Sequence, residues 1–195
     1  MLSIFQNNPD KLLSQATEMK DKGKFDKAIE KLKNAYIAIA KSKTIYPIGT
    51  FLRLPIYLQQ ANKNDEAWKE FNSLLLNGYA NQIKDPDLIP MDHCAIYDKM
   101  RLFLQREKRF KKSIIFGIYS FISWGIGLYY QNRKDELKIY ISNENMDKQI
   151  SKLLKKAKII DKKDEIINII YTHINLLPKI DFKQLGNEIS LIITD

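Results

Sequence analysis

Cysteine is almost missing from this chain of 195 residues, because Cys94 is the only one. A single thiol cannot form a disulfide within the chain, so an apolar core has to stabilise the fold. The first residues, Met1 to Asp10, have neither the basic stretch nor the long apolar stretch of a secretory signal peptide. These absences predict a protein of the reducing cytoplasm.

Glycine and proline are also scarce, with seven and six residues, and so few helix breakers favour long helices over a turn-rich β sandwich. The glycines are scattered, so no phosphate-binding glycine loop is formed. The nucleophile motif Gly-x-Ser-x-Gly and the ligand spacings of zinc sites are missing as well. We therefore expect no cofactor and no catalysis, and a small helical enzyme or metal-binding protein is the third alternative.

Positive charge exceeds negative charge, and the formal net charge of +9 raises the question of an anionic partner. Most of the charge is interleaved, as around Lys22 to Lys27, and such a mixed face is usually only solvated. Denser basic runs occur at Arg106 to Lys112 and at Lys152 to Lys163. A nucleic-acid-associated regulator that uses this basic surface is therefore the second alternative.

One long apolar run, Ser113 to Tyr130, tests whether the chain is soluble. It has no charge and follows a basic flank, and a membrane-spanning helix needs about 20 predominantly apolar residues. The run also contains three glycines and three serines. A helix that is apolar on all sides is expected where neighbouring helices cover both of its faces. We expect a buried helix here and no membrane span.

Two segments on either side of the Lys22-Gly23 turn have apolar residues at helical spacing. Small residues, Ala16 in the first and Ala28 in the second, would let the two helices cross closely. Asp10 precedes the first segment and is expected to cap it. The apolar positions are Leu12, Ala16 and Met19 in the first segment, and Ala28, Leu32 and Ala35 in the second.

This helix pair resembles the tetratricopeptide repeat (TPR), a helix–turn–helix unit of about 34 residues. The family pattern has a glycine, an aromatic residue two positions later, an alanine three positions further, and a second alanine seven beyond that. Leu12 replaces the family's tryptophan, and Ala40 stands near the place of its closing proline. The matching positions here are Gly23, Phe25, Ala28 and Ala35.

A second unit repeats part of the pattern around Ala67, which is expected to be buried at a helix crossing like Ala28. Its partner helix is expected to extend from Pro47 to Gln60, with a kink at Pro55, because an interior proline removes a backbone hydrogen bond. Leu74 replaces the second alanine.

A third helix pair begins near Asp92 and has Ser113 at the small-residue position. Ala28, Ala67 and Ser113 are spaced more widely than the family period, so the connections are longer. The resemblance covers about residues 9–131.

Beyond Asn132 the family pattern is lost, and three further helices are expected. They cover Met146 to Ile160, Glu165 to Leu177 with a stop at Pro178, and a last short helix that Asp181 caps. A repeat stack needs its last unit covered by an element with a polar outer side. We therefore predict an all-α fold, with about three TPR-like units in residues 1–131 and a C-terminal helical cap in residues 132–195.

Chemically reactive side chains gather only between Asp85 and Cys94. His93 and Cys94 are neighbours and would point apart on a helix, whereas metal ligands must converge. We interpret this segment as a loop and helix cap, and expect no metal. His173 has no acidic partner at helical spacing and is expected to be a surface or partly buried residue.

The TPR resemblance implies a concave face, lined mainly by the first helix of each unit, that binds an extended peptide or a partner helix. Cationic residues there would bind carboxylates, and leucine and isoleucine would supply apolar contact. Some of these side chains could instead pack on the C-terminal helices. We predict a non-catalytic adaptor or regulator whose partner is another protein or peptide. The predicted partner-binding residues are Leu13, Thr17, Lys20, Leu52, Arg53, Ile56, Gln59, Asp98, Lys99, Leu102, Gln105 and Arg106.

Overall fold

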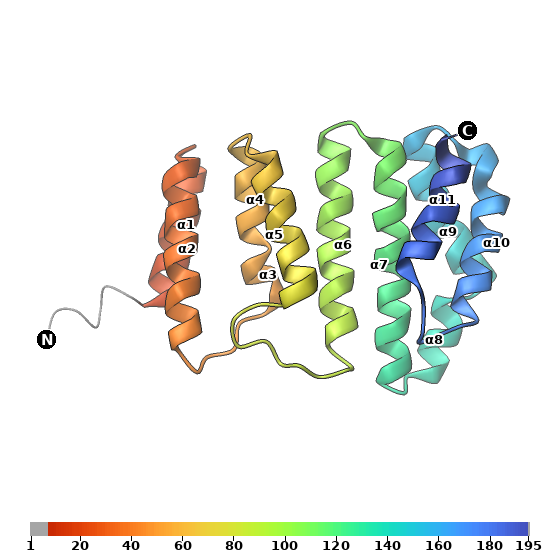
Figure 1. Cartoon of the computed structure of the whole chain (residues 1–195), viewed down its shortest axis with the longest axis horizontal. Helices are drawn as coiled ribbons and strands as arrows, with labels where there is room; N and C mark the ends of the chain where they lie inside the picture. Colours follow the sequence, from red (N-terminus) through yellow and green to blue (C-terminus); the bar gives the residue numbers. More distant parts are fainter. Residues whose placement is uncertain (1–7, 195) are drawn as a thin grey trace, which may run out of the picture. The chain divides into compact units, whose positions relative to one another are not determined.

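A computed structural model describes residues 8–194 and divides into two compact units, of which the first ends at Ile83 and the second begins at Lys84. Within the described residues all regular structure is helical and no strand occurs, which confirms the prediction of an all-α protein. The first unit contains α1 (Pro9–Asp21), α2 (Phe25–Lys41), α3 (Ile48–Phe51), α4 (Arg53–Gln60) and α5 (Asn64–Asn77). The second contains α6 (Ile89–Arg106), α7 (Phe110–Tyr130), α8 (Lys134–Tyr140), α9 (Asn143–Ala157), the 3-10 turn η1 (Ile160–Lys162), α10 (Lys163–Ile174) and α11 (Phe182–Thr194) (Figure 1).

In the first unit, α1 packs against α2, α4 packs against α5, and α2 contacts α4 (Figure 1). Ala16, Ala28 and Ala67 are fully buried, so the expected burial of alanine in these helix pairs is confirmed. A side chain of one carbon lets two helix backbones approach closely. Lys63, at the turn between α4 and α5, adds an ion pair with Asp26 on α2 at 2.7 Å.

The helix expected from Pro47 to Gln60 is interrupted at Leu52, which separates α3 from α4. Pro55 has no N–H, so the carbonyl of Phe51, four residues earlier, loses its helical donor. The hydroxyl of Tyr36 on α2 lies in this gap and donates to the carbonyl of Thr50 at 2.7 Å and, at 3.3 Å, to that of Phe51. A side chain of another helix thus donates to the backbone carbonyls at the break, including the one that Pro55 leaves without a helical donor.

The start of α1 differs from the sequence expectation, because Asn8 and not Asp10 is the N-cap. The Asn8 side chain accepts a hydrogen bond from the backbone N–H of Lys11 at 3.2 Å. Asp10 lies inside the first turn, and its carboxylate accepts a hydrogen bond from the Tyr46 hydroxyl at 2.8 Å. Proline is well suited to the first helical position, so Pro9 moves the start of the helix forward.

Four helix–helix turns share one backbone conformation. A residue with positive φ, near the left-handed helical region, occupies each turn: Gly23, Asn62, Lys108 and Asn132. The N–H of the next residue then returns to a carbonyl five residues earlier, at 2.9 to 3.0 Å in all four cases. This arrangement satisfies the last carbonyls of the preceding helix. The turn at Asn132 lies at the point where the sequence pattern was expected to end.

The second unit is built around α7, which contacts α6, α8, α9 and α11. Apolar side chains of α7, α9, α10 and α11 form its core, including Ile118, Ile150, Ile170 and Ile189, all fully buried. Among the described helices, α7 alone is long and apolar enough to cross a bilayer, and 61% of its most apolar stretch is buried inside the protein. Neighbouring helices therefore cover much of the apolar surface of α7.

The helices α9 and α10 begin and end within three residues of the expected positions, whereas α8 was not expected. Asp181 caps α11 as expected, and its carboxylate accepts hydrogen bonds from the N–H groups of Lys183 and Gln184 at 2.8 and 2.9 Å. The sequence predicted a boundary after residue 131, but the structure divides after Ile83. The helices α6 and α7 therefore belong with the C-terminal helices and not with α1 to α5. The reason is that α7 packs both on α6 and on the C-terminal helices.

Candidate functional site

In the first unit, Arg53 joins two helices that lie far apart in the sequence. Its Nη2 atom on α4 donates to the backbone oxygen of Leu13 on α1 at 2.8 Å and to the Thr17 hydroxyl at 2.7 Å. It also lies 3.3 Å from the Tyr57 hydroxyl, and the guanidinium carbon is 5.7 Å from the centre of that ring. The structure thus brings together Leu13, Thr17 and Arg53, three of the predicted residues.

The surface around this contact is here called the α1–α4 face, and it consists of Thr17, Lys20, Arg53, Ile56 and Gln59. Thr17 is exposed, and the other four are partly exposed. Lys20 forms an ion pair with Asp21 at 2.5 Å, and this hydrogen bond raises the pKa of the Lys20 ammonium. The face therefore combines two cations with one apolar and two neutral polar side chains.

Leu13 and Leu52 differ from the other predicted residues of the first unit, because both side chains are buried in its core. Their apolar side chains are consequently covered, and Leu13 contributes only its backbone oxygen to the Arg53 contact. Helical spacing placed them beside the face, but the side chains lean inward against neighbouring helices. They support the face and do not line it.

In the second unit, part of the predicted face on α6 is covered by α9. The ammonium of Lys156 on α9 donates to the side-chain oxygen of Gln105 at 2.7 Å, and Gln105 is buried. Lys99 and Leu102 are partly buried, while Arg106 is exposed. The groove that was expected to be open is therefore closed at Gln105, because α9 of the same chain covers this side chain.

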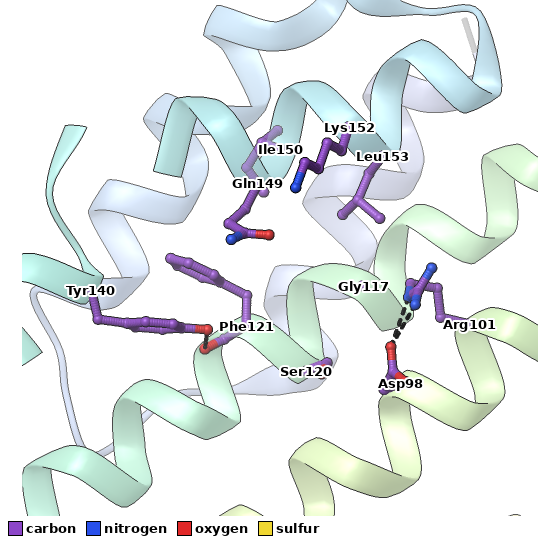
Figure 2. A pocket seen from close by; sticks show the side chains of 10 residues that line it. All are labelled: Asp98, Arg101, Gly117, Ser120, Phe121, Tyr140, Gln149, Ile150, Lys152 and Leu153. Carbon is purple, nitrogen blue, oxygen red and sulfur yellow. Dashed lines mark hydrogen bonds and ion pairs between the residues drawn. The ribbon is translucent and has the colours of Figure 1, made fainter. Parts of the chain in front are cut away.

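Asp98 lies at the edge of a pocket between α6, α7 and α9 (Figure 2). Its Oδ1 atom accepts two hydrogen bonds from Arg101, at 2.6 and 3.0 Å, and Oδ2 lies 3.8 Å from the Lys99 ammonium. The pocket has a volume of about 240 Å³. Its lining residues are Asp98, Arg101, Gly117, Ser120, Phe121, Tyr140, Gln149, Ile150, Lys152 and Leu153.

In the wall of this pocket, Leu153 of α9 approaches the backbone of α7 closely at Gly117. A β carbon at that position would lie 2.6 Å from Cδ1 of Leu153 and 3.1 Å from Cδ of Arg101. One turn further along α7, the ring of Phe121 stacks on that of Tyr140 with centres 4.6 Å apart. Figure 2 shows the Gln149 amide between the Phe121 ring and Leu153. The pocket therefore offers charged, amide and aromatic groups for binding.

Nucleophilic chemistry is not favoured by the groups around this pocket. The Ser120 hydroxyl donates to the backbone oxygen of Cys94 at 3.0 Å and lies 3.3 Å from its sulfur. Burial raises the pKa of the Cys94 thiol, which disfavours the reactive thiolate. Among residues 8–194, no group of three or more His, Cys, Asp and Glu side chains could hold a metal ion.

The segment from Asp85 to Cys94 forms a turn followed by the start of α6. The Asp85 carboxylate accepts a hydrogen bond from the N–H of Asp87 at 2.9 Å, and α6 begins at Ile89. His173 differs from its expectation, because it is buried and its Nε2 lies 3.0 Å from Glu188 on the next helix. The pairing crosses from α10 to α11, so helical spacing within one segment could not show it.

Several residues of these sites were missed by sequence reasoning. The Arg101–Asp98 pair spans three residues of one helix and the Arg53–Tyr57 contact spans four, so both spacings were visible in the sequence. Lys156 lies 51 residues from Gln105, and no local pattern connects them. No protein-family model, curated protein or solved structure matches this chain. The function therefore has to be inferred from the residues and their geometry.

Proposed function

We propose that this protein is a non-catalytic adaptor or regulator whose α1–α4 face binds an acidic segment of another protein. The observation that carries the proposal is the fixed position of Arg53. Its three hydrogen bonds all involve Nη2, so the N–H groups of Nη1 and Nε remain as single donors to a carboxylate. A guanidinium has five N–H donors in a planar fork that matches a carboxylate.

Fixing Arg53 before binding favours affinity. A free arginine side chain loses rotamer entropy when it binds, at a cost of about 0.5–1.5 kcal/mol for a flexible interface side chain. The contacts with Leu13, Thr17 and Tyr57 already order the Arg53 side chain in the folded protein, so less entropy is lost on binding. Lys20, whose ammonium is paired with Asp21, is the second cation of the face, and Ile56 is its apolar side chain.

We also propose that α1/α2, α4/α5 and α6/α7 are each a helix pair of the kind that builds TPR stacks. Burial of Ala28, Ala67 and Ser113 at equivalent positions supports this arrangement. The shared turn conformation at Gly23, Asn62 and Lys108 supports it independently. In such stacks the first helices of the units form the surface that binds extended peptides or helices.

The test is affinity capture from the native host, with mass spectrometry to identify bound proteins. Wild-type chain is compared with Arg53→Glu and with Lys69→Glu, which reverses an exposed charge on α5. We expect a partner that wild type and Lys69→Glu capture equally and Arg53→Glu does not. Arg53→Lys should bind more weakly than wild type, because the single nitrogen of lysine cannot keep the Leu13 and Thr17 contacts and also donate to a ligand as the three guanidinium nitrogens can. Circular dichroism checks that each variant keeps the helical content of wild type.

Equal capture by wild type, Arg53→Glu and Lys69→Glu would contradict the proposal. So would an absence of any specifically captured protein.

The second candidate is a nucleic-acid-associated regulator, and the basic turn between α6 and α7 favours it. Lys108, Arg109, Lys111 and Lys112 are exposed there, and Arg109 pairs with Glu107 at 3.2 Å. Phosphate binding of this kind falls steeply with salt, and removal of one cation lowers the salt slope by about one. We expect weak binding of duplex and single strands that disappears at physiological salt. Tight binding of nucleic acid at physiological salt would contradict the adaptor proposal and favour the nucleic-acid-associated regulator.

A further inference from the structure

An apolar groove with a volume of about 590 Å³ lies at the end of α7 and along α8. It is here called the tyrosine groove, and the residues that matter are Tyr129, Tyr130, Lys134, Leu137, Lys138 and Ile141. We propose that this groove binds an amphipathic, acidic helix of a partner protein. The groove belongs to the second unit, so this inference is independent of the α1–α4 face and goes beyond the adaptor function proposed for that face.

The two tyrosines are large apolar side chains that folding leaves in water. Tyr129 is 47% exposed and Tyr130 is 42% exposed, and their rings meet edge to face with centres 5.8 Å apart. Contiguous exposed apolar surface of this kind marks interaction sites in soluble proteins. Tyrosine is also enriched at interface positions that contribute most binding energy, because it buries a large ring and can still donate a hydrogen bond.

The opposite wall of the groove is one stripe of α8 together with its C-cap residue, Ile141. Lys134, Leu137, Lys138 and Ile141 follow the spacing i, i+3, i+4 and i+7, which places them on one helix face. Another part of α8 already packs on α7, since Tyr140 stacks on Phe121 and donates to its backbone oxygen at 3.2 Å. The groove stripe therefore borders the side of α8 that packs on α7, and its geometry suits another helix laid along it.

The positive charge of the groove indicates that its partner carries acidic side chains. Lys134 and Lys138 are the charged residues of its lining, and no carboxylate lies among the lining residues. The nearby Glu136 is held by Arg133, whose Nε donates to it at 2.8 Å, so this acid does not neutralise either lysine. A partner helix with aspartate or glutamate beside an apolar stripe would match both the two cations and the apolar floor.

The experiment selects peptides of about 16 residues, or roughly four helical turns, from a random displayed library on the immobilised full-length chain. We expect enrichment of sequences with apolar residues at i, i+3 or i+4, and i+7, and with acidic residues between them. Affinity of the selected peptides is then measured by fluorescence anisotropy for wild type, Tyr130→Ser and Lys138→Glu. Each substitution should weaken binding at least about tenfold, as truncation of a central interface side chain does.

Matched controls separate the groove from general apolar or charge effects. Ile139→Ser changes an apolar side chain of α8 that is 70% exposed and lies outside the groove lining. Lys148→Glu reverses an exposed lysine of α9. Both variants should bind the selected peptides like wild type. Arg53→Glu should also leave this binding unchanged, so failure of the α1–α4 face and failure of the groove give different results.

Two outcomes would overturn the proposal. The first is a selection whose peptides lack acidic residues or bind Tyr130→Ser and Lys138→Glu as tightly as wild type. The second is association with vesicles of phosphatidylglycerol and phosphatidylcholine that Tyr130→Ser abolishes, without any enriched peptide. Aromatic and lysine side chains also suit an anionic lipid surface, and that result would assign the groove to a membrane.

Discussion

The Nε2 atom of His173 on α10 lies 3.0 Å from the Oε2 atom of Glu188 on α11. Glu188 also accepts a hydrogen bond from Gln184 at 2.8 Å through its other carboxylate oxygen. The hydrogen bond with His173 is the largest of the effects that lower the pKa of the Glu188 carboxyl, and the bond from Gln184 is the next. The pair therefore links α10 to α11 most strongly when Glu188 is ionised.

The first prediction concerns acid stability. Because the folded state lowers the pKa of Glu188, its contribution to stability is present above the ordinary value of 4.5 and is lost as the pH falls through the folded value. Glu188→Gln should lower the free energy of unfolding near neutral pH and reduce its dependence on pH under acidic conditions. Urea unfolding at a series of pH values measures both, with exposed Glu144→Gln as the control. An identical pH dependence in all three proteins would contradict this role.

The second prediction concerns the crossing of α1 and α2 at Ala28. This residue is fully buried, so the larger side chain of Ala28→Leu must force the helices apart. Overpacking of this kind typically costs about 1–3 kcal/mol. Lys27→Leu, one residue earlier on the exposed side, should change little. The measurement is the shift in melting temperature, and equal shifts for the two variants would show that the assigned helix face is wrong.

The third prediction compares two glycines of α7. Alanine favours a helix interior over glycine by about 1 kcal/mol. At Gly125 a new β carbon would lie 3.8 Å from Leu137, an ordinary contact, so Gly125→Ala should stabilise the protein by about that amount. At Gly117 the same atom would meet Leu153 at 2.6 Å, and Gly117→Ala should lose the gain or destabilise. Chemical denaturation distinguishes them, and equal stabilisation at both positions would contradict the close approach of α9.

The fourth prediction tests the left-handed turns. Gly23 has φ of 70°, where a β carbon is disfavoured, so Gly23→Ala should cost about 1 kcal/mol. Lys108 has φ of 60° with a side chain present, so Lys108→Gly should stabilise the protein by up to about 1 kcal/mol. Lys112→Gly, within α7, should instead destabilise it, because glycine weakens helices. Equilibrium unfolding should give opposite signs for Lys108→Gly and Lys112→Gly, and a shared sign would argue against the turn geometry.

The fifth prediction concerns α7. Its most apolar stretch is largely buried, and Ile114, Ile118 and Ile122 lie in the core of the second unit. We expect the full-length chain, expressed without detergent, to remain in the supernatant after high-speed centrifugation. Recovery only in membranes, with resistance to carbonate extraction, would mean that α7 spans the bilayer. Helical content by circular dichroism provides the check that soluble protein is folded.

Local sequence determined the helices and many of their ends. Apolar residues at helical spacing and scarce breakers predicted an all-helical chain, and the cap at Asp181 was visible because an N-cap acts within three residues. The buried alanines were likewise visible, since a small residue on an apolar helix face indicates a close crossing. The cap at Asn8 was missed, although Pro9 lies beside it in the sequence, and the kink expected at Pro55 appears as a break at Leu52, three residues earlier.

Only the tertiary structure decided which helices meet and which polar groups pair. His173 with Glu188, Lys156 with Gln105, and Arg53 with the Leu13 carbonyl all join separate helices. Such contacts depend on how whole helices pack, and packing free energy is summed over many side chains far apart in the sequence. The periodicity of one helix therefore determines which face is apolar, whereas the identity of the neighbour that covers this face is decided only when the helices pack together.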